Sequence, residues 1–198
     1  SLNINLPKKL KINKFSSDIL DRKWDLIVIA VSSIGIDLIG KNLSKIKNKT
    51  PILVLTKGLK LDGRNLISMS SILRKYNKNL NISVLKGPCL AKELARKVKS
   101  FTVIANKNIN TAKKIGKLIS TNYYQTEFSR DVNGVEFLSA IKNIYSMIIG
   151  AGQWHNTSSA LFRKSIDEMK YLANYFKGKK ETVYGLAGLG DLYVSAMG

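Results

Sequence analysis

Short apolar runs alternate with amphipathic segments over the first 130 residues, and this alternation constrains the fold more than any other feature. Five runs are predicted strands, the most apolar of them typical of strands buried on both faces: residues 25–31, 51–58, 81–87, 101–107 and 123–129. Helical spacing predicts helices between them, over residues 34–47, 64–76, 88–98 and 109–120. Strand–helix alternation of this kind predicts an α/β fold with a doubly wound, mostly parallel sheet.

The pattern changes near residue 130. Two long helical patterns, over residues 133–152 and 157–176, follow one another with no strand-like run between them. We therefore expect an α/β domain over residues 1–130 and an all-α helical domain over residues 131–198. The helical part is short for a complete core, and no G-x-G-x-x-G follows any predicted strand, although a Rossmann-like sheet places one after its first strand. The sequence thus predicts an incomplete Rossmann-like sheet followed by a truncated helical domain.

The formal net charge of +20 raises the question of a polyanionic partner such as nucleic acid. A bias towards Lys, Asn and Ile across the coding sequence would produce the same charge. The lysines are scattered, Arg is rare beside Lys, and no run interleaves aromatic with basic residues as in single-strand binders. We therefore do not expect nucleic acid to be the main partner.

Composition also bears on the compartment and on metal sites. Cys89 is the single cysteine and His155 the single histidine, which excludes an internal disulfide and a cluster of soft metal ligands. The longest apolar run, LIVIAV, is too short to span a bilayer, and no signal-peptide pattern is present. We expect a cytoplasmic protein without a metal or a membrane span. Because the chain begins with Ser rather than Met, we expect it to be a processed or partial piece of a longer protein.

Two glycine-containing segments follow predicted strands, at the sheet edge where open α/β folds bind ligands. In LTKGL, Lys57 either lines such a site or is a solvated lysine in a turn. In LKGPCLAKELA, Gly87 permits close approach to a helix start that offers N–H groups to an anion. The other interpretation is a simple helix start with Pro88 in its first turn. Cys89 could have a lowered pKa there, but no activating base is identifiable.

A lysine interrupts the apolar pattern of the helix predicted over residues 133–152. One stripe at helical spacing comprises Val135, Leu138, Lys142, Tyr145 and Ile149. A second stripe beside it comprises Phe137, Ile141, Ile144 and Ile148. Burying an unpaired ammonium group costs several kcal/mol or lowers its pKa by up to ~3–5 units. A structural lysine can extend its charged end to water. We favour the interpretation that Lys142 lines a cleft between two domains.

The segment GLAGLGDL near the end of the chain is rich in glycine and carries Asp191. This carboxylate is either the N-cap of a following helix or the partner of a buried cation. We expect Trp154 to be part of the core or to line a cleft. The neighbouring His155 is expected to be a surface or packing residue.

Taken together, these segments resemble the NAD(P)-dependent glycerol-3-phosphate dehydrogenases. The resemblance covers essentially the whole chain and keeps the family's order: LIVIAVSS, LTKGL, KGPCLAKELA, GVEFLSAIKNI, IDEM and GLAGLGDL. It implies a Rossmann domain that binds NAD or NADP and a helical domain that supplies catalytic groups. The implied reaction is hydride transfer between NAD(P)H and dihydroxyacetone phosphate, which gives sn-glycerol 3-phosphate for phospholipid synthesis.

The resemblance also implies roles for individual residues. Lys142 matches the catalytic lysine that acts on the substrate oxygen. Lys57 matches a lysine that lines the site shared by substrate and cofactor. Asp191 matches a carboxylate that contacts a substrate hydroxyl or orients the catalytic lysine. We expect these two lysines and the aspartate to lie close together.

Three further positions follow from the resemblance. Gly87 and Cys89 match the loop beside the substrate, and Ala91 matches a position that contacts the cofactor. The family usually has Ser or Thr where this chain has Cys89, so a hydroxyl contact there would be weakened. The family also usually has a longer glycine-rich segment where this chain has only residues 153–155.

Two other functions stay open at this point. One is a related two-domain hydroxyacid reductase with another substrate, and the other is a non-enzymatic basic module that binds anions. For the favoured function we expect a small-molecule substrate, with a homodimer as a possible assembly. The 198-residue chain alone is expected to be inactive and to bind NAD(P) poorly.

Overall fold

A five-stranded sheet forms the centre of the first part of the chain. The computed structural model describes residues 7–46 and 49–197. The strands in spatial order are β1 (Ile27–Ile29), β2 (Ile52–Val54), β5 (Ile82–Lys86), β6 (Ser100–Ala105) and β7 (Tyr124–Ser129). Neighbouring strands are parallel except β5 and β6, which are antiparallel. The predicted α/β fold with a mostly parallel sheet is confirmed.

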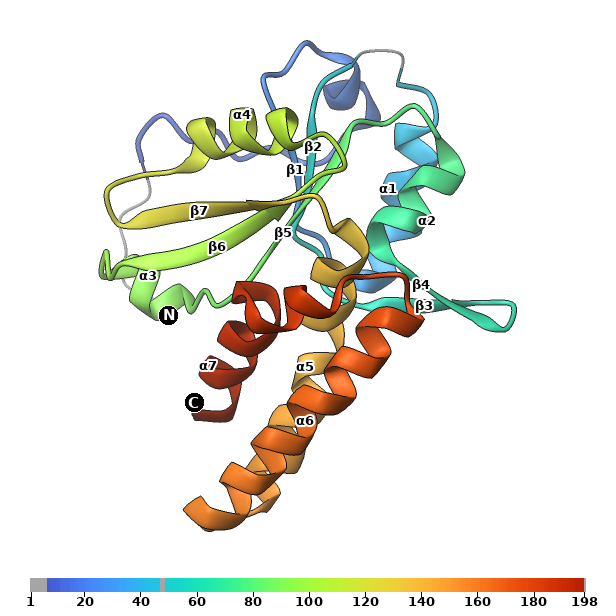
Figure 1. The fold of residues 1–198 in the computed structure, drawn as a ribbon. Helices are drawn as coiled ribbons and strands as arrows, with labels where there is room; N and C mark the ends of the chain where they lie inside the picture. Colours follow the sequence, from blue (N-terminus) through green and yellow to red (C-terminus); the bar gives the residue numbers. More distant parts are fainter. Residues whose placement is uncertain (1–6, 47–48, 198) are drawn as a thin grey trace.

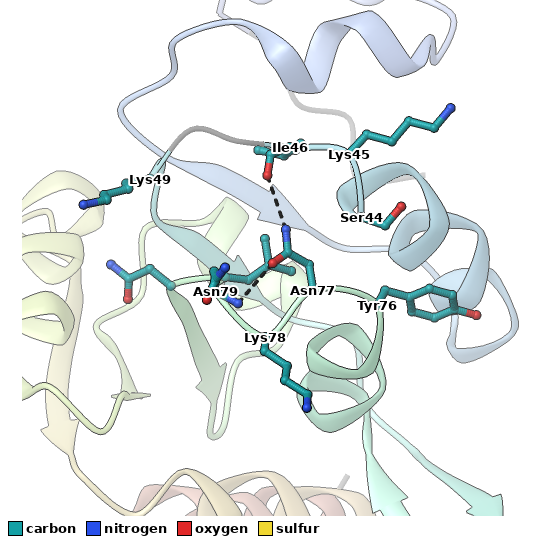
Figure 2. A pocket seen from close by; sticks show the side chains of 10 residues that line it. Ser44, Lys45, Ile46, Lys49, Tyr76, Asn77, Lys78 and Asn79 are labelled. Carbon is teal, nitrogen blue, oxygen red and sulfur yellow. Dashed lines mark hydrogen bonds between the residues drawn. The ribbon is translucent and has the colours of Figure 1, made fainter.

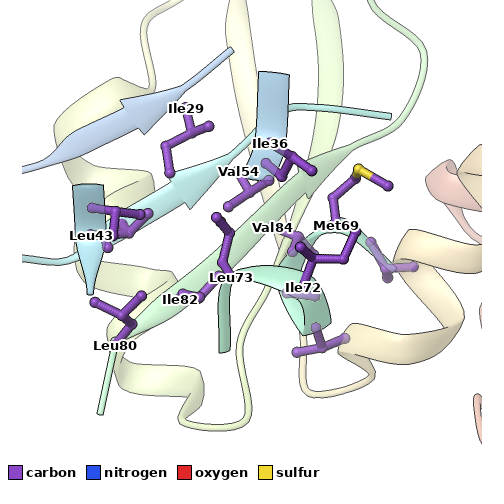
Figure 3. Packing of buried hydrophobic residues seen from close by; sticks show 14 of the residues in the cluster. Ile29, Ile36, Leu43, Val54, Met69, Ile72, Leu73, Leu80, Ile82 and Val84 are labelled. Atoms are coloured by element: carbon purple, nitrogen blue, oxygen red, sulfur yellow. The ribbon is translucent and has the colours of Figure 1, made fainter. Parts of the chain in front are cut away.

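Helices cover both faces of this sheet (Figure 1). On one face lie α1 (Ile36–Leu43) and α2 (Met69–Tyr76), and on the other lies α4 (Ile109–Ile119). Side chains of a strand alternate between the faces, so Val54 packs in the α1 and α2 cluster shown in Figure 3, while Leu53 packs with α4. Two buried faces explain why the strands are apolar without interruption. The predicted end of the first helix at residue 47 lies outside the described residues.

A β-hairpin replaces the start of the helix predicted over residues 64–76. Strands β3 (Leu59–Asp62) and β4 (Asn65–Ser68) are antiparallel, and α2 begins only at Met69. The turn contains Gly63 with a φ of 60°, a left-handed conformation that favours glycine. Asp-Gly between alternating apolar residues is a hairpin signal, and it outweighs the helical spacing here.

The helix predicted over residues 88–98 is also much shorter. Helix α3 (Ala91–Ala95) has only five residues, because Leu90 before it is extended, with φ of −83° and ψ of 122°. Pro88 therefore lies in the loop and not in the first helical turn, which corrects the prediction of a simple helix start. Gly87 has a φ of 121°, and the loop turns sharply at this position.

After β7 the chain is helical. The two long helices are α5 (Val132–Ala151) and α6 (His155–Tyr175), followed by a 3-10 turn over Lys180–Tyr184, a π-helical turn over Leu186–Gly190 and α7 (Asp191–Met197). Their shared core contains Phe137, Leu138, Met169 and Leu192. The first turn of α5 instead packs into the α/β core through Val132 and Val135. Helix α5 thus joins the two cores, and the division of the chain near residue 130 stays a prediction.

Burial along α5 agrees with only part of the pattern. All five residues of the stripe that contains Lys142 are buried. In the second stripe Phe137 and Ile141 are buried but Ile144 and Ile148 are exposed, because α6 and α7 pack on other sides of α5. Trp154 is 76% exposed, so its placement in a core or cleft is wrong. His155 is exposed, as expected. Over residues 7–46 and 49–197, no helix has the length and apolarity needed to cross a membrane.

Candidate active site

A buried carboxylate lies where the sheet meets the helices. Asp191 is 2% exposed and is the first residue of α7. Its Oδ2 accepts a hydrogen bond from Lys57 Nζ at 2.9 Å, and its Oδ1 accepts one from Lys142 Nζ. Ser139 Oγ donates to Oδ2 at 3.3 Å. The expected closeness of the two lysines and the aspartate is confirmed.

Asp191 is placed by the glycine-rich π-helical turn that precedes it. Its own backbone is helical, with φ of −70° and ψ of −32°, so it is not the N-cap of α7. The alternative interpretation, a partner for a buried cation, agrees with the structure. Gly188 is required in this turn because a Cβ atom there would lie 2.2 Å from the Val183 carbonyl oxygen.

Lys142 is paired at every donor position of its ammonium group. It is 7% exposed, and besides Asp191 Oδ1 it donates to Ser195 Oγ at 2.6 Å and to the Asp191 carbonyl oxygen at 3.4 Å. Its charged end therefore does not reach out to water. Burial lowers the pKa of Lys142, and the hydrogen bond to Asp191 opposes this effect.

Lys57 lies on the solvent-exposed side of the cluster around Asp191. It lies three residues past the end of β2, and its side chain is 43% exposed. Gly58 follows with a φ of 140°, and a Cβ atom there would lie 3.2 Å from Ser33 Cβ. The site thus has two ammonium groups for one carboxylate, and this net positive charge favours an anionic ligand.

The loop after β5 lies beside this cluster. A Cβ atom on Gly87 would lie 3.3 Å from Thr102 Cα and 3.5 Å from Leu186 Cβ, so the loop approaches the π-helical turn closely. Cys89 is exposed, and partial burial of its sulfur raises the pKa of the thiol, although Lys57 acts in the opposite direction. The idea of a lowered pKa at Cys89 is therefore wrong. Ala91 begins α3 on the exposed side of the loop.

Three polar residues in or beside the cluster were not identified from the sequence. Ser139 and Ser195 both contact Asp191 or Lys142. Ser195 follows Asp191 by four residues, which places both on one helix face, so this spacing could have revealed it. Lys86, 2% exposed, ends β5 close to Lys57. A lysine at the end of the apolar run NISVL was the available signal for it.

A hollow lies at the opposite edge of the sheet. It has a volume of about 1070 Å³ and is lined by residues of the loops that follow α1 and α2, including Lys45, Asn77 and Lys78 (Figure 2). Asn77 Nδ2 donates to the Ile46 carbonyl oxygen at 3.3 Å across it. The loop after α2 leads into the first residue of β5, whereas the cluster of Asp191 lies past the last residue of β5. The hollow therefore does not belong to the candidate site.

The chemistry of the site suits a phosphate-bearing group better than a metal. Within the described ranges, no group of three or more His, Cys, Asp or Glu side chains could hold a metal ion. Lys57 and Gly58 at the carboxyl edge offer an exposed cation and backbone without a Cβ atom, which fits part of an anionic dinucleotide such as NAD(P). A G-x-G-x-x-G phosphate loop is not among the 198 residues.

Comparison with protein families gives two matches that together cover most of the chain. Residues 2–112 match the family model described as NAD-dependent glycerol-3-phosphate dehydrogenase N-terminus. Residues 131–198 match the corresponding C-terminus model. The N-terminus model matches the first part of the chain and the C-terminus model the second part, in agreement with the order of the sequence motifs.

Individual relatives agree with these matches. A glycerol-3-phosphate dehydrogenase [NAD(P)+] of Clostridium botulinum (strain Eklund 17B / Type B) is 34% identical over 178 residues, which are 86% of this chain and 52% of the relative. A second one, from Clostridium botulinum (strain Alaska E43 / Type E3), is 32% identical and covers 98% of this chain and 59% of its own length. The chain thus spans between half and three fifths of the length of these relatives.

Solved structures show the same fold. The glycerol-3-phosphate dehydrogenase of Coxiella burnetii is 28% identical, with a TM-score of 0.85 over 98% of this chain and 60% of that one. The structure of DsGPDH of Dunaliella salina has a TM-score of 0.89 at 21% identity, over 99% of this chain and 35% of that one, and shows the fold alone. On the family matches over residues 2–112 and 131–198, the chain belongs to the NAD-dependent glycerol-3-phosphate dehydrogenase family.

Proposed function

We propose that the full-length protein is an NAD(P)-dependent glycerol-3-phosphate dehydrogenase that converts dihydroxyacetone phosphate to sn-glycerol 3-phosphate for phospholipid synthesis. The observation that carries this proposal is the buried carboxylate of Asp191 between the ammonium groups of Lys57 and Lys142. The α/β part, residues 1–130, would bind the cofactor, and the helical part, residues 131–198, would supply the proton donor. A cytoplasmic homodimer that does not bind nucleic acid is part of the same proposal.

In this proposal Lys142 acts as a general acid. NADH or NADPH, when bound, would supply the hydride to C2 of the substrate. The C2 oxygen then becomes an alkoxide and takes a proton from Lys142 Nζ, which is left as a neutral amine and regains a proton from water. Burial lowers the pKa of Lys142 and so brings the amine nearer to the working pH, where proton transfer in both directions is efficient.

The neighbouring residues hold this donor and the substrate. Asp191 and Ser195 fix the position of the Lys142 ammonium group through their hydrogen bonds. Lys57, the exposed cation, would contact substrate and cofactor. Gly87 and Cys89 would lie against the substrate through the loop after β5.

The remaining cofactor contact is assigned to Ala91 at the start of α3. Each of these roles rests on the match to the family's motifs, and those of Lys57 and Lys142 rest also on their contacts with Asp191. Fixing reacting groups in place before reaction is itself a large part of catalysis in such a site.

The test is NADH or NADPH oxidation by the full-length protein. Oxidation should require dihydroxyacetone phosphate, and Lys142→Met should reduce kcat by about a thousandfold, because the proton donor is lost. The fold should be retained, since Asp191 keeps Lys57 and Ser139 as partners. Lys113→Met, on the exposed side of α4, is the matched control and should keep full activity.

Two results would contradict the proposal. One is equal turnover in the wild type and in Lys142→Met, and the other is substrate-dependent oxidation only with a different hydroxyacid precursor in a substrate panel. The second result would favour the related reductase. Salt-sensitive binding of a DNA duplex at nanomolar protein without any turnover would favour a basic anion-binding module.

A further inference from the structure

Lys86 is a buried cation outside the cluster of Asp191. It is the last residue of β5, is 2% exposed, and forms no ion pair with any of the described carboxylates. Its Nζ donates to the carbonyl oxygens of Leu55 at 3.0 Å and of Thr56 at 2.6 Å. These carbonyls belong to the two residues that come directly before Lys57, so Lys86 holds the backbone from which Lys57 extends.

The same contacts continue across the carboxyl edge of the sheet. Thr56 Oγ1 donates to the Val31 carbonyl oxygen, past the end of β1, at 2.8 Å. Thr102 Oγ1, on β6, donates to the Lys86 carbonyl oxygen at 2.5 Å. Lys86 is therefore the central member of a row of hydrogen bonds that fixes the end of β2 between its neighbours.

A purely structural role is a weak explanation for a lysine at this position. Burying an ammonium group is costly, and an apolar side chain of similar volume would fill the space without that cost. The ammonium group of Lys86 instead serves as the hydrogen-bond donor for two backbone carbonyls, because buried carbonyls require donors and the negative ends of their dipoles favour a cation. These carbonyls come directly before the one exposed lysine of the candidate site.

We propose that Lys86 is a positioning residue, which fixes the backbone at Leu55 and Thr56 and thereby holds the ammonium group of Lys57 at Asp191. The link to catalysis rests on the proposed function, because Lys57 lies in the site assigned to substrate and cofactor. Lys86 acts through the backbone of Leu55 and Thr56, directly past the end of β2.

The pKa of Lys86 depends on its burial and on the charged groups near it, which include Lys57 and Asp191. Burial lowers its pKa to about 8, Glu136 and Asp191 act to raise it, and Lys57 acts to lower it further. Lys86 is therefore an ammonium ion at pH 7 and loses its proton within an accessible pH range. Loss of the charge weakens both hydrogen bonds to the carbonyls.

A double-mutant cycle in the full-length protein tests the proposal through activity. Lys86→Met should lower kcat/KM about tenfold, mainly through a higher KM, because Lys57 is no longer held in place. The double variant Lys57→Met with Lys86→Met should be no worse than Lys57→Met alone, within about twofold. Additive losses would overturn the proposal, because they would mean that Lys86 does not act through Lys57.

The matched control lies at the other end of β5. Asn106 is buried and its Nδ2 donates to the Ile82 carbonyl oxygen at 3.1 Å. Asn106→Ala thus removes a buried side-chain contact to the first residue of the same strand, and it should lower stability while leaving KM unchanged. A rise of KM in Asn106→Ala equal to that in Lys86→Met would also overturn the proposal.

A second measurement uses the wild type and needs no activity. In an NMR titration, the backbone amide signals of Lys57 and Gly58 should shift with the same midpoint as the Lys86 ammonium group, and the amide of Ile82 should not. Amide signals of Lys57 and Gly58 that do not follow Lys86 would overturn the positioning role. If the wild type lacks turnover with dihydroxyacetone phosphate, the proposed function fails while this titration still decides the role of Lys86.

Discussion

At the scale of single residues, the site is set by one carboxylate shared between two lysines. Lys57 comes from the end of β2 and Lys142 from the middle of α5, and both reach Asp191. The sequence indicated each lysine by a local anomaly, a cation after a buried strand and a cation in an apolar stripe. For Lys86 the sequence offered a cation at the end of an apolar run but not its partners, the carbonyls of Leu55 and Thr56. These residues follow β2 about 30 residues earlier, and only the parallel register of β2 and β5 brings them to Lys86.

The buried charge of Lys86 gives a prediction for stability. Its pKa is about 8 in the folded protein against 10.5 in the unfolded chain, so between these pH values the unfolded state binds more protons. The free energy of unfolding of the full-length wild type should therefore rise relative to Lys86→Met, by up to about 3 kcal/mol between pH 7.5 and 10.5. Urea unfolding of both proteins across this range measures the difference.

The control for this experiment is again Asn106→Ala, whose side chain does not titrate. Its free energy of unfolding should run parallel to that of the wild type at all pH values. Parallel curves for wild type and Lys86→Met would mean that Lys86 has no lowered pKa in the folded protein.

At the scale of elements, helical periodicity predicted the long helices well and the short ones poorly. In α5 the stripe from Val135 to Ile149 marks a buried face over about four turns, so α5 lies close to its expected range. Over residues 64–68, helical spacing continued by chance into β4, and the Asp-Gly turn before it was the decisive local signal. Short elements carry few periods, so a single turn residue can outweigh them.

The start of α5 depends on one side chain. Asp131 is buried and accepts hydrogen bonds from Gly134 N at 2.9 Å, Lys179 N at 2.8 Å and Thr182 Oγ1 at 2.6 Å. It is therefore the N-cap of α5, and it also fixes the chain that follows α6. Glu136, one turn later, accepts from Ser70 N at 3.0 Å and so ties α5 to the start of α2.

We predict that Asp131→Ala lowers the free energy of unfolding by about 2–3 kcal/mol, because it removes a cap and leaves two further donors unsatisfied. Thermal or urea unfolding of the full-length protein measures this loss. The matched control is Asp167→Ala on the exposed face of α6, which breaks only surface pairs with Arg163 and Lys170 and should change stability by less than about 1 kcal/mol. Equal losses in the two variants would contradict the role of Asp131.

At the scale of the whole molecule, the sequence predicted which faces are apolar but not what covers them. Ile144, Ile148 and Trp154 follow the apolar pattern yet are exposed in the described part of the chain. A periodic pattern reports only that a face is apolar, and the packing partner is a property of the complete fold. In the same way, the order of the motifs indicated the family, whereas the spatial order of strands and the antiparallel β6 came only from the structure.

The last prediction concerns the cofactor and the chain as a unit. In a Rossmann fold the pyrophosphate is bound by backbone N–H groups of a G-x-G-x-x-G turn, and the 198 residues contain no such motif. The chain alone should therefore bind NADH or NADPH with a Kd no lower than about 1 mM, even though Lys57 and Gly58 are present at the carboxyl edge. Titration calorimetry at about 0.2 M salt, which screens the net charge, measures this affinity.

The full-length protein in the same buffer is the positive control. It should bind the cofactor at least about a hundredfold more tightly, a difference in binding free energy of roughly 2.7 kcal/mol. Micromolar binding by the 198-residue chain would mean that the residues around Lys57 hold the cofactor by themselves, and the assignment of the cofactor site would then be wrong.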